Sequence, residues 1–298
     1  MRRTVSIRNK AYLHTEHKSL VIDRDDGMDR RVPLDDIYVL VIDDQRVTLS
    51  ARLLSDMADA GIGVLTCGSN HMPNGMALPL GAHSRYAGLV EQQLSMSKPL
   101  VKQLWQKIVK RKIENQAAVL RLVGLDDSEL ISYAKDVKSG DSTNREAVAA
   151  ARYFDALIEE GTRWDSIWTA PLNYGYAVLR AGLAQAAVSR GWMVSRGLHH
   201  RSEQNAFNLV DDMIEPFRPL IDAIAFSQGV ASPLSPEDKR ALTRVHEVAV
   251  EMGARRVSCQ RACMEAFESL RAVLIEDDAE LLELPRFCGL EMATRYKG

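Results

Sequence analysis

KPLVKQLWQKIVKRKIENQAAVLRLVG, residues 98–124, is the stretch that decides the fold. Its apolar residues recur every three or four positions, which is the period of one buried face of an α-helix. The same period returns in NREAVAAARYFDALIEEG at 144–161 and in NYGYAVLRAGLAQAAVSRG at 173–191. These three stretches predict a large helical region beyond about residue 84.

The first 80 residues follow another pattern. Short apolar runs typical of strands stand at RTVSI, SLVID, IYVLVID and IGVLTC, and turn signals follow at DDGM and MPNGM. One short helix is expected between the third and fourth runs, starting after Ser50 as N-cap and ending near Gly61. This part of the chain therefore predicts a small β-rich domain.

A further helix is predicted in SPEDKRALTRVHEVAVEM, residues 235–252, with Ser235 as its N-cap and Pro236 at its first helical position. The fold class that follows is α+β. A small, sandwich-like β-rich domain over residues 1–80 precedes a larger all-α domain over residues 81–298. A short linker, PLGAHSR at 79–85, joins the two.

The composition is typical of a folded protein that does not span a membrane. A hydrophobic content of 46% over 298 residues is typical of a folded chain, and no apolar run reaches the roughly 20 residues that cross a bilayer. The four cysteines show no C-x-x-C pair and the polar start is unlike a signal peptide, so we expect reduced thiols in a cytoplasmic protein without membrane contact.

Positive charge is concentrated in one region, although the formal net charge is −2. Residues 84–125 hold eight Lys/Arg and two Glu, a local balance of 8 − 2 = +6. The candidate DNA contacts are Lys107, Lys110, Arg111 and Lys112, which would bind phosphates rather than read bases. A solvated helix face whose lysines serve solubility is the alternative.

Acidic residues gather in GLHHRSEQNAFNLVDDMIEPFRPLID, residues 197–222. On a helix over 205–222, a polar stripe would lie within about 60° of Glu215 and would hold Asn208, Asp211, Asp212, Arg218 and Asp222. Pro216 predicts a kink within that helix. The stripe is either the wet face of an amphipathic helix or a cation site, because two carboxylates that converge repel unless a cation offsets them. His199 and His200 precede it, which favours the cation site.

Glu146 is a second candidate. The sequence Thr143-x-x-Glu146 fits a capping box, in which the glutamate bonds to the Thr143 backbone N–H. The small residues that follow, Ala147 and Ala149 to Ala151, would instead let another helix approach Glu146 closely. Both interpretations stay open on the residues alone.

The chain resembles the CRISPR adaptation integrases in three segments that occur in the same order: NREA…ARYF, NYGYAVLR and GLHH…NLVDDMIEPFRPLID. The residues HHRSEQN…EPFRP are similar to those of members from type II systems. The likeness covers nearly the whole chain. It implies an enzyme that inserts new spacers into CRISPR arrays by attack of a 3′-hydroxyl on the repeat backbone, with associated DNA cleavage. It also implies double-stranded protospacer and repeat DNA as substrates, a homodimer formed through the N-terminal domain, and a small nuclease-like partner protein.

In the site that this resemblance implies, Glu146, His200 and Glu215 are the catalytic residues and bind one divalent metal. Asp212 and His199 are the residues that would support or replace these ligands, and some members carry aspartate where this chain has Glu215. Mg²⁺ or Mn²⁺ suits carboxylates with one imidazole, whereas no thiolate set or H-E-x-x-H pattern favours zinc. A stand-alone metallonuclease and a non-catalytic helical DNA-binding scaffold are the alternative functions.

Overall fold

The computed structural model describes residues 2–80 and 83–293. Its N-terminal region forms two four-stranded sheets. The first has the order β1-β5-β7-β8, in which β1, β5 and β7 are parallel and β8 is antiparallel to β7. Its strands are β1 (Arg3–Ile7), β5 (Ile37–Ile42), β7 (Gly63–Cys67) and β8 (Pro73–Ala77). The second has the order β4-β3-β2-β6, built from β2 (Tyr12–Glu16), β3 (Ser19–Asp23), β4 (Arg30–Pro33) and β6 (Thr48–Leu49).

A shared apolar core makes this region a sandwich. Leu13 and Leu20 of one sheet and Ile37 and Leu40 of the other are fully buried in it. Helix α1 (Ala51–Asp59) closes one end, with the Ser50 side chain accepting a hydrogen bond from the Leu53 N–H. The predicted sandwich-like region, its strands and its helix are therefore confirmed.

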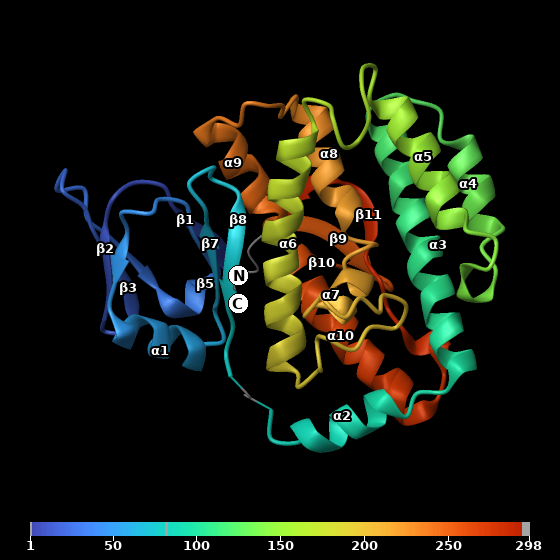
Figure 1. The fold of residues 1–298 in the computed structure, drawn as a ribbon, viewed down its shortest axis with the longest axis horizontal. Coiled ribbons are helices and arrows are strands. Elements are labelled where there is room, and N and C mark those ends of the chain that lie inside the picture. The colour runs from blue at the N-terminus through green and yellow to red at the C-terminus, as the bar shows by residue number, and fades with distance from the viewer. Residues whose placement is uncertain (1, 81–82, 294–298) are drawn as a thin grey trace.

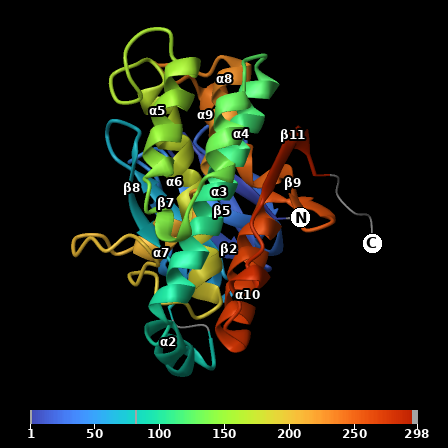
Figure 2. The same ribbon diagram turned by 90° about the vertical axis from the view of Figure 1, so that its right-hand side faces the viewer.

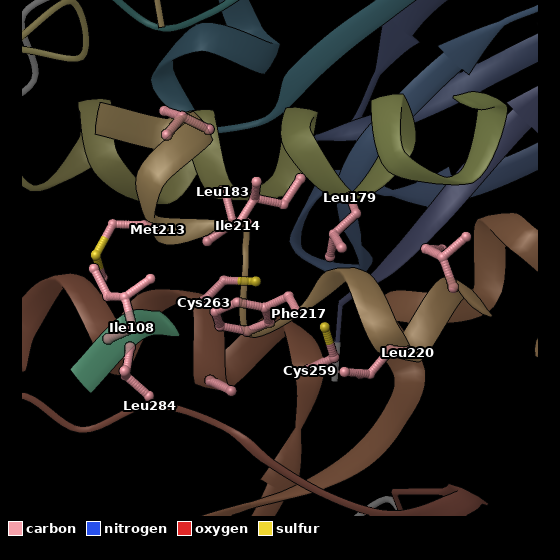
Figure 3. Close-up of a cluster of buried hydrophobic side chains, with 14 of the residues drawn as sticks. Ile108, Leu179, Leu183, Met213, Ile214, Phe217, Leu220, Cys259, Cys263 and Leu284 are labelled. Atoms are coloured by element: carbon pink, nitrogen blue, oxygen red, sulfur yellow. The ribbon is translucent and has the colours of Figure 1, made fainter. Parts of the chain in front are cut away.

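The rest of the chain is mainly helical (Figures 1 and 2). Its helices are α2 (Tyr86–Leu94), α3 (Lys98–Leu122), α4 (Ser128–Lys135), α5 (Arg145–Leu157), α6 (Thr169–Ser189), α7 (Asn208–Met213), α8 (Arg218–Gln228), α9 (Pro236–Thr243) and α10 (Cys259–Glu276). A buried cluster from α3, α6, α7, α8 and α10 forms the main core, shown in Figure 3. Among the described helices, none is both long and apolar enough to cross a membrane.

Helix α6 lies between the sandwich and helices α3, α4 and α5 in Figure 1. Every residue of β5 is buried, and its side chains divide between the sandwich core and the main core. The Tyr38 hydroxyl donates a hydrogen bond of 2.6 Å to the Gly182 carbonyl of α6. At the end of β5, Asp43 forms a buried ion pair of 2.7 Å with Lys239 of α9. The two regions thus share an apolar and ionic contact. The predicted boundary at 80/81 adjoins residues 81–82, which lie outside the described residues.

A small sheet corrects the expectation of an all-helical second region. Strands β9 (Val248–Met252), β10 (Arg255–Ser258) and β11 (Arg286–Met292) pair in the order β10-β9-β11. The helix predicted over 235–252 ends at Thr243, and its last five residues form β9 instead. The β-branched Val248 and Val250 are fully buried there. On one side β9 pairs with β10, which follows it in a hairpin, and on the other it pairs with β11, which begins only at Arg286. The predicted N-cap holds, because Ser235 and Asp238 form a capping box.

Candidate active site

Glu146 lies in the first turn of α5, and its side chain makes no capping box. The carboxylate of Asp141 accepts hydrogen bonds from the backbone N–H groups of Arg145 at 2.8 Å and Glu146 at 3.0 Å, and so caps the helix. Asn144 takes a left-handed conformation with φ of 53°, and its side chain does not cap. The glutamate is therefore free for another contact, and the capping interpretation is wrong.

That contact is Lys112, in the middle of α3. Its Nζ lies 2.7 Å from Glu146 Oε1 and 2.5 Å from Glu215 Oε2. Glu215 comes from the turn between α7 and α8, and its Oε1 accepts a hydrogen bond of 2.8 Å from Arg218 Nε. Two carboxylates from distant parts of the chain thus converge on one ammonium group. Lys112 and Glu215 are both buried, at 9% and 5% exposure.

Electrostatic interactions keep Glu215 and Lys112 ionised. Burial alone would raise the pKa of Glu215, but the positive charges of Arg218 and Lys112 outweigh it and hold that pKa at about 2. Burial likewise disfavours the charged form of Lys112, yet the two carboxylates raise its pKa above the ordinary value. The cluster is a charged network inside the protein, where each charge depends on its partners.

His200 is held by Asp212. Its Nδ1 lies 2.6 Å from Asp212 Oδ1, and the hydrogen bond to that carboxylate raises the pKa of His200, with smaller contributions from the charges of Glu215 and Glu146. The fully buried Asp212 also accepts hydrogen bonds from the backbone N–H groups of Leu198, His199 and His200. Its oxygens are thereby committed to the loop, and His200 Nε2 is left to face other groups.

A glycine makes this loop possible. A Cβ at position 197 would lie 2.5 Å from the His200 carbonyl oxygen and 2.7 Å from Asp212 Oδ2, which is closer than real Cβ contacts. Gly197 therefore lets the chain wrap around the carboxylate of Asp212.

His199 stacks on Trp105 of α3. The two ring centroids are 4.2 Å apart and the planes are 3° from parallel, while His200 meets the same indole edge-on at 5.9 Å. Trp105 and Lys112 are seven residues apart, or about two helical turns, so their side chains lie on the same face of α3. This face forms one side of the site. Trp105 was not a candidate in the sequence, although this spacing from Lys112 could have suggested it.

The predicted acidic stripe is divided by the chain's path. Residues 205–222 form no single helix, because α7 ends at Met213 and α8 starts at Arg218, with Pro216 between them and Pro219 in the first turn of α8. Asp211 pairs instead with Arg180 of α6 at 2.6 Å. Asp222 is buried and accepts hydrogen bonds from the hydroxyls of Tyr153 and Tyr176. Only Glu215 reaches Lys112 directly.

The four basic candidates are likewise separated. Lys107, Lys110 and Arg111 line a surface cavity of about 470 Å³ between α3 and residues 280–284. Lys107 Nζ pairs there with Glu280 at 3.1 Å, and Arg111 with Glu114 at 3.0 Å. Lys112 was expected on the same surface, but it is buried. It follows Lys107 by five residues, which rotates its side chain by about 140° around the helix axis.

The donor set suits a hard divalent cation. Two carboxylates and one imidazole whose other nitrogen is already bonded are ligands that Mg²⁺ and Mn²⁺ accept. In the described part of the chain, no three His, Cys, Asp or Glu side chains are already arranged around one point as a metal site. Glu146 and Glu215 do converge, but on the ammonium of Lys112.

Comparison with known proteins adds independent findings. The family model described as CRISPR associated protein Cas1 matches residues 5–162 and 165–241. A CRISPR-associated endonuclease Cas1 from Neisseria meningitidis serogroup C (strain 8013) is 39% identical over 297 residues, which cover 97% of each chain. Among solved structures, a casposase bound to integration product matches with a TM-score of 0.75 at 17% identity, covering 93% of this chain and 91% of that one. A chain of a Cas6-RT-Cas1–Cas2 complex matches with a TM-score of 0.70 at 14% identity, covering 99% of this chain and 36% of that one.

The sequence matches define a CRISPR-associated enzyme, and the structural matches share its fold. The chain belongs to the Cas1 family. It is an endonuclease and integrase of spacer acquisition, and the predicted family, function and α+β fold are confirmed.

Proposed function

We propose that Glu146, His200 and Glu215 together bind one Mg²⁺ or Mn²⁺ ion at which spacer DNA is joined to the CRISPR repeat. The observation that carries this proposal is the convergence of Glu146 and Glu215 on one cationic position. Carboxylates that meet inside a protein need a cation between them, and a metal bound there would use the same oxygens.

His200 completes the proposed ligand set through Nε2. Asp212 fixes the ring by accepting from the backbone of the loop and by bonding to Nδ1. A metal-binding histidine commonly has such a carboxylate behind it, which sets the tautomer and the ring orientation. Asp212 is thus a positioning residue, and Glu215 is the acidic ligand. His199, stacked on Trp105, anchors the loop.

The reaction we propose is transesterification. The 3′-hydroxyl oxygen of the incoming DNA attacks a phosphorus of the repeat strand, and a new P–O bond forms as the bond to the repeat's own 3′-oxygen breaks. The attacking hydroxyl loses a proton and the displaced oxygen gains one, so the number of phosphodiesters is unchanged. A divalent cation supplies charge neutralisation at the phosphate and activation of the attacking oxygen. With water as the attacking group, the same step is hydrolysis.

We also propose the partners of the reaction. Double-stranded protospacer and repeat DNA are the substrates, with Lys107, Lys110 and Arg111 as phosphate contacts on the surface. A homodimer and a small nuclease-like partner protein would complete the assembly, in the cytoplasm. The similarity to a chain of a Cas1–Cas2 complex supports such an assembly.

Three variants test the site. Glu146→Gln, His200→Ala and Glu215→Gln should each abolish joining of a labelled protospacer to a repeat duplex, because a metal acts on the transition state more than on backbone affinity. Binding of the same duplex should stay within about threefold of wild type by the same reasoning. Glu91→Gln, on the exposed face of α2, is the matched control and should join normally.

Two other results would redirect the proposal. Metal-dependent cleavage without any joining would favour a stand-alone metallonuclease. Full joining by Glu146→Gln would remove this glutamate from the site.

A further inference from the structure

Lys112 is a buried cation placed where the metal-binding carboxylates meet. Its charge made it a DNA-contact candidate, but its exposure is 9% and its Nζ touches both Glu146 and Glu215. The lysine comes from the middle of α3, whereas the glutamates come from the start of α5 and from the turn before α8. Three segments distant in sequence are therefore tied together by one ammonium group.

The charges explain why the contact forms without a metal. Two carboxylates brought together in a buried site repel strongly, and a buried charge without a partner is far more costly than a paired one. Arg218 neutralises only the Oε1 side of Glu215. The ammonium of Lys112 supplies the missing positive charge between the other carboxylate oxygens.

An ammonium and a divalent cation cannot both hold these oxygens. Lys112 Nζ lies 2.7 Å from Glu146 Oε1 and 2.5 Å from Glu215 Oε2. A divalent cation held by the same two carboxylates would bring a second positive charge close to this ammonium, and the two charges would repel in a site of low dielectric. Binding of the metal must therefore release Lys112 from at least one of its two contacts.

We infer that Lys112 is an internal counter-ion that holds Glu146 and Glu215 together in the metal-free protein and is exchanged for the divalent cation when it binds. This inference rests on the proposed metal site. Lys112 is a positioning residue in this role: it prepares the carboxylates for the metal and competes with it. The site is then assembled before the metal arrives, and its apparent affinity for metal is reduced by the competition.

Lys112→Met tests the exchange, because methionine keeps an unbranched stem and removes the charge. We expect Mn²⁺, titrated calorimetrically in the absence of DNA, to bind this variant roughly tenfold or more tightly than wild type, since no ammonium opposes it. In EDTA the variant should unfold roughly 5 to 10 °C below wild type, because the buried carboxylates lose their counter-ion. Saturating Mn²⁺ should recover more of the unfolding temperature in the variant than it adds to wild type.

Lys110→Met is the matched control. It makes the same charge change on the same helix, at an exposed position outside the carboxylate cluster. Its affinity for Mn²⁺ and its unfolding temperature should stay close to those of wild type. An unchanged or weakened Mn²⁺ affinity in Lys112→Met would overturn the exchange.

The glutamate variants separate this inference from the metal site itself. If Glu146→Gln and Glu215→Gln lose Mn²⁺ binding while Lys112→Met binds like wild type, only the counter-ion role fails. If the glutamate variants bind Mn²⁺ normally, the proposed metal site fails and the exchange with it.

A double variant keeps the test usable if Lys112→Met is too unstable to titrate. The double variant Lys112→Met with Glu215→Gln removes one charge of each sign. In EDTA, the decrease in its unfolding temperature should therefore be much smaller than the sum of the decreases in the two single variants. Strictly additive losses would show that the two side chains do not stabilise each other and would overturn the inference.

Discussion

Asp222 should make the stability of this protein fall as pH rises from 4 to 7. The residue lies in α8 at 1% exposure, and the hydroxyls of Tyr153 and Tyr176 donate hydrogen bonds to its two oxygens. Burial raises the pKa of Asp222 from the ordinary 3.8 to about 6, although both hydroxyls act to lower it. Its protonated form is therefore the one that the folded state prefers.

The sign and size follow from proton linkage. A carboxyl whose pKa is higher in the folded state stabilises that state fully below 3.8 and loses this contribution as pH rises through 6. A shift of 6 − 3.8, or about 2 pKa units at roughly 1.4 kcal/mol each, corresponds to about 3 kcal/mol in all. Between pH 4 and pH 7, about 2 kcal/mol of that difference should be lost.

Asp222→Asn isolates this contribution, because an amide stays neutral at every pH. The free energy of unfolding of the variant, relative to wild type, should rise by about 2 kcal/mol between pH 4 and pH 7. Urea unfolding followed by tryptophan fluorescence at pH 4, 5.5 and 7 measures this difference. A difference that is constant across the three pH values would refute the reasoning.

Asp211→Asn supplies a control of opposite sign. Arg180 and Asn205 bind the carboxylate of Asp211 and, against the effect of burial, lower its pKa. A lowered pKa stabilises the folded state above the unfolded value and is lost as pH falls. Asp211→Asn should therefore lose stability relative to wild type as pH rises, in contrast to Asp222→Asn.

Two further predictions concern the interface of α6 and the basic surface. Gly182→Ala should destabilise the fold by roughly 1 to 3 kcal/mol in urea unfolding, because the new Cβ would lie 2.2 Å from His246 Nε2; an equally stable variant would contradict this close approach. Replacing Lys107, Lys110 and Arg111 together with alanine should reduce the slope of log DNA affinity against log salt by up to about 3, at roughly 0.9 per phosphate contact. An unchanged slope would assign these residues to the ion pairs on their own surface.

Local patterns predicted much of the fold because they act over short distances. Ser50 and Ser235 each cap the helix that their positions indicated, and the buried run at residues 37–42 forms a strand. The sheet of the helical region was not predicted. Residues 248–252 continue a plausible helical pattern. They form β9 by pairing with the adjacent hairpin strand β10 and with β11, and β11 lies well beyond any local window.

The site shows the same limit. The residues Glu146, His200 and Glu215 were identified by resemblance, not by geometry, and their roles stay a proposal. A helical wheel over 205–222 grouped Asp211 and Asp222 with Glu215, but the break near Pro216 sends the three to different partners. A helical wheel is valid only for one uninterrupted helix. The kink predicted from Pro216 was the feature of the sequence that indicated an interruption.

Lys112 shows why charge counts cannot assign a lysine to a surface. Its sequence neighbours Lys110 and Arg111 line the surface cavity, and only the rotation of the helix directs Lys112 inward. A lysine remains buried and charged only where carboxylates from elsewhere meet it, as Glu146 and Glu215 do. Its role therefore depends on contacts between segments far apart in the chain, which no local window contains. For the same reason, the metal affinity of Lys112→Met is the measurement that distinguishes an internal counter-ion from a DNA contact.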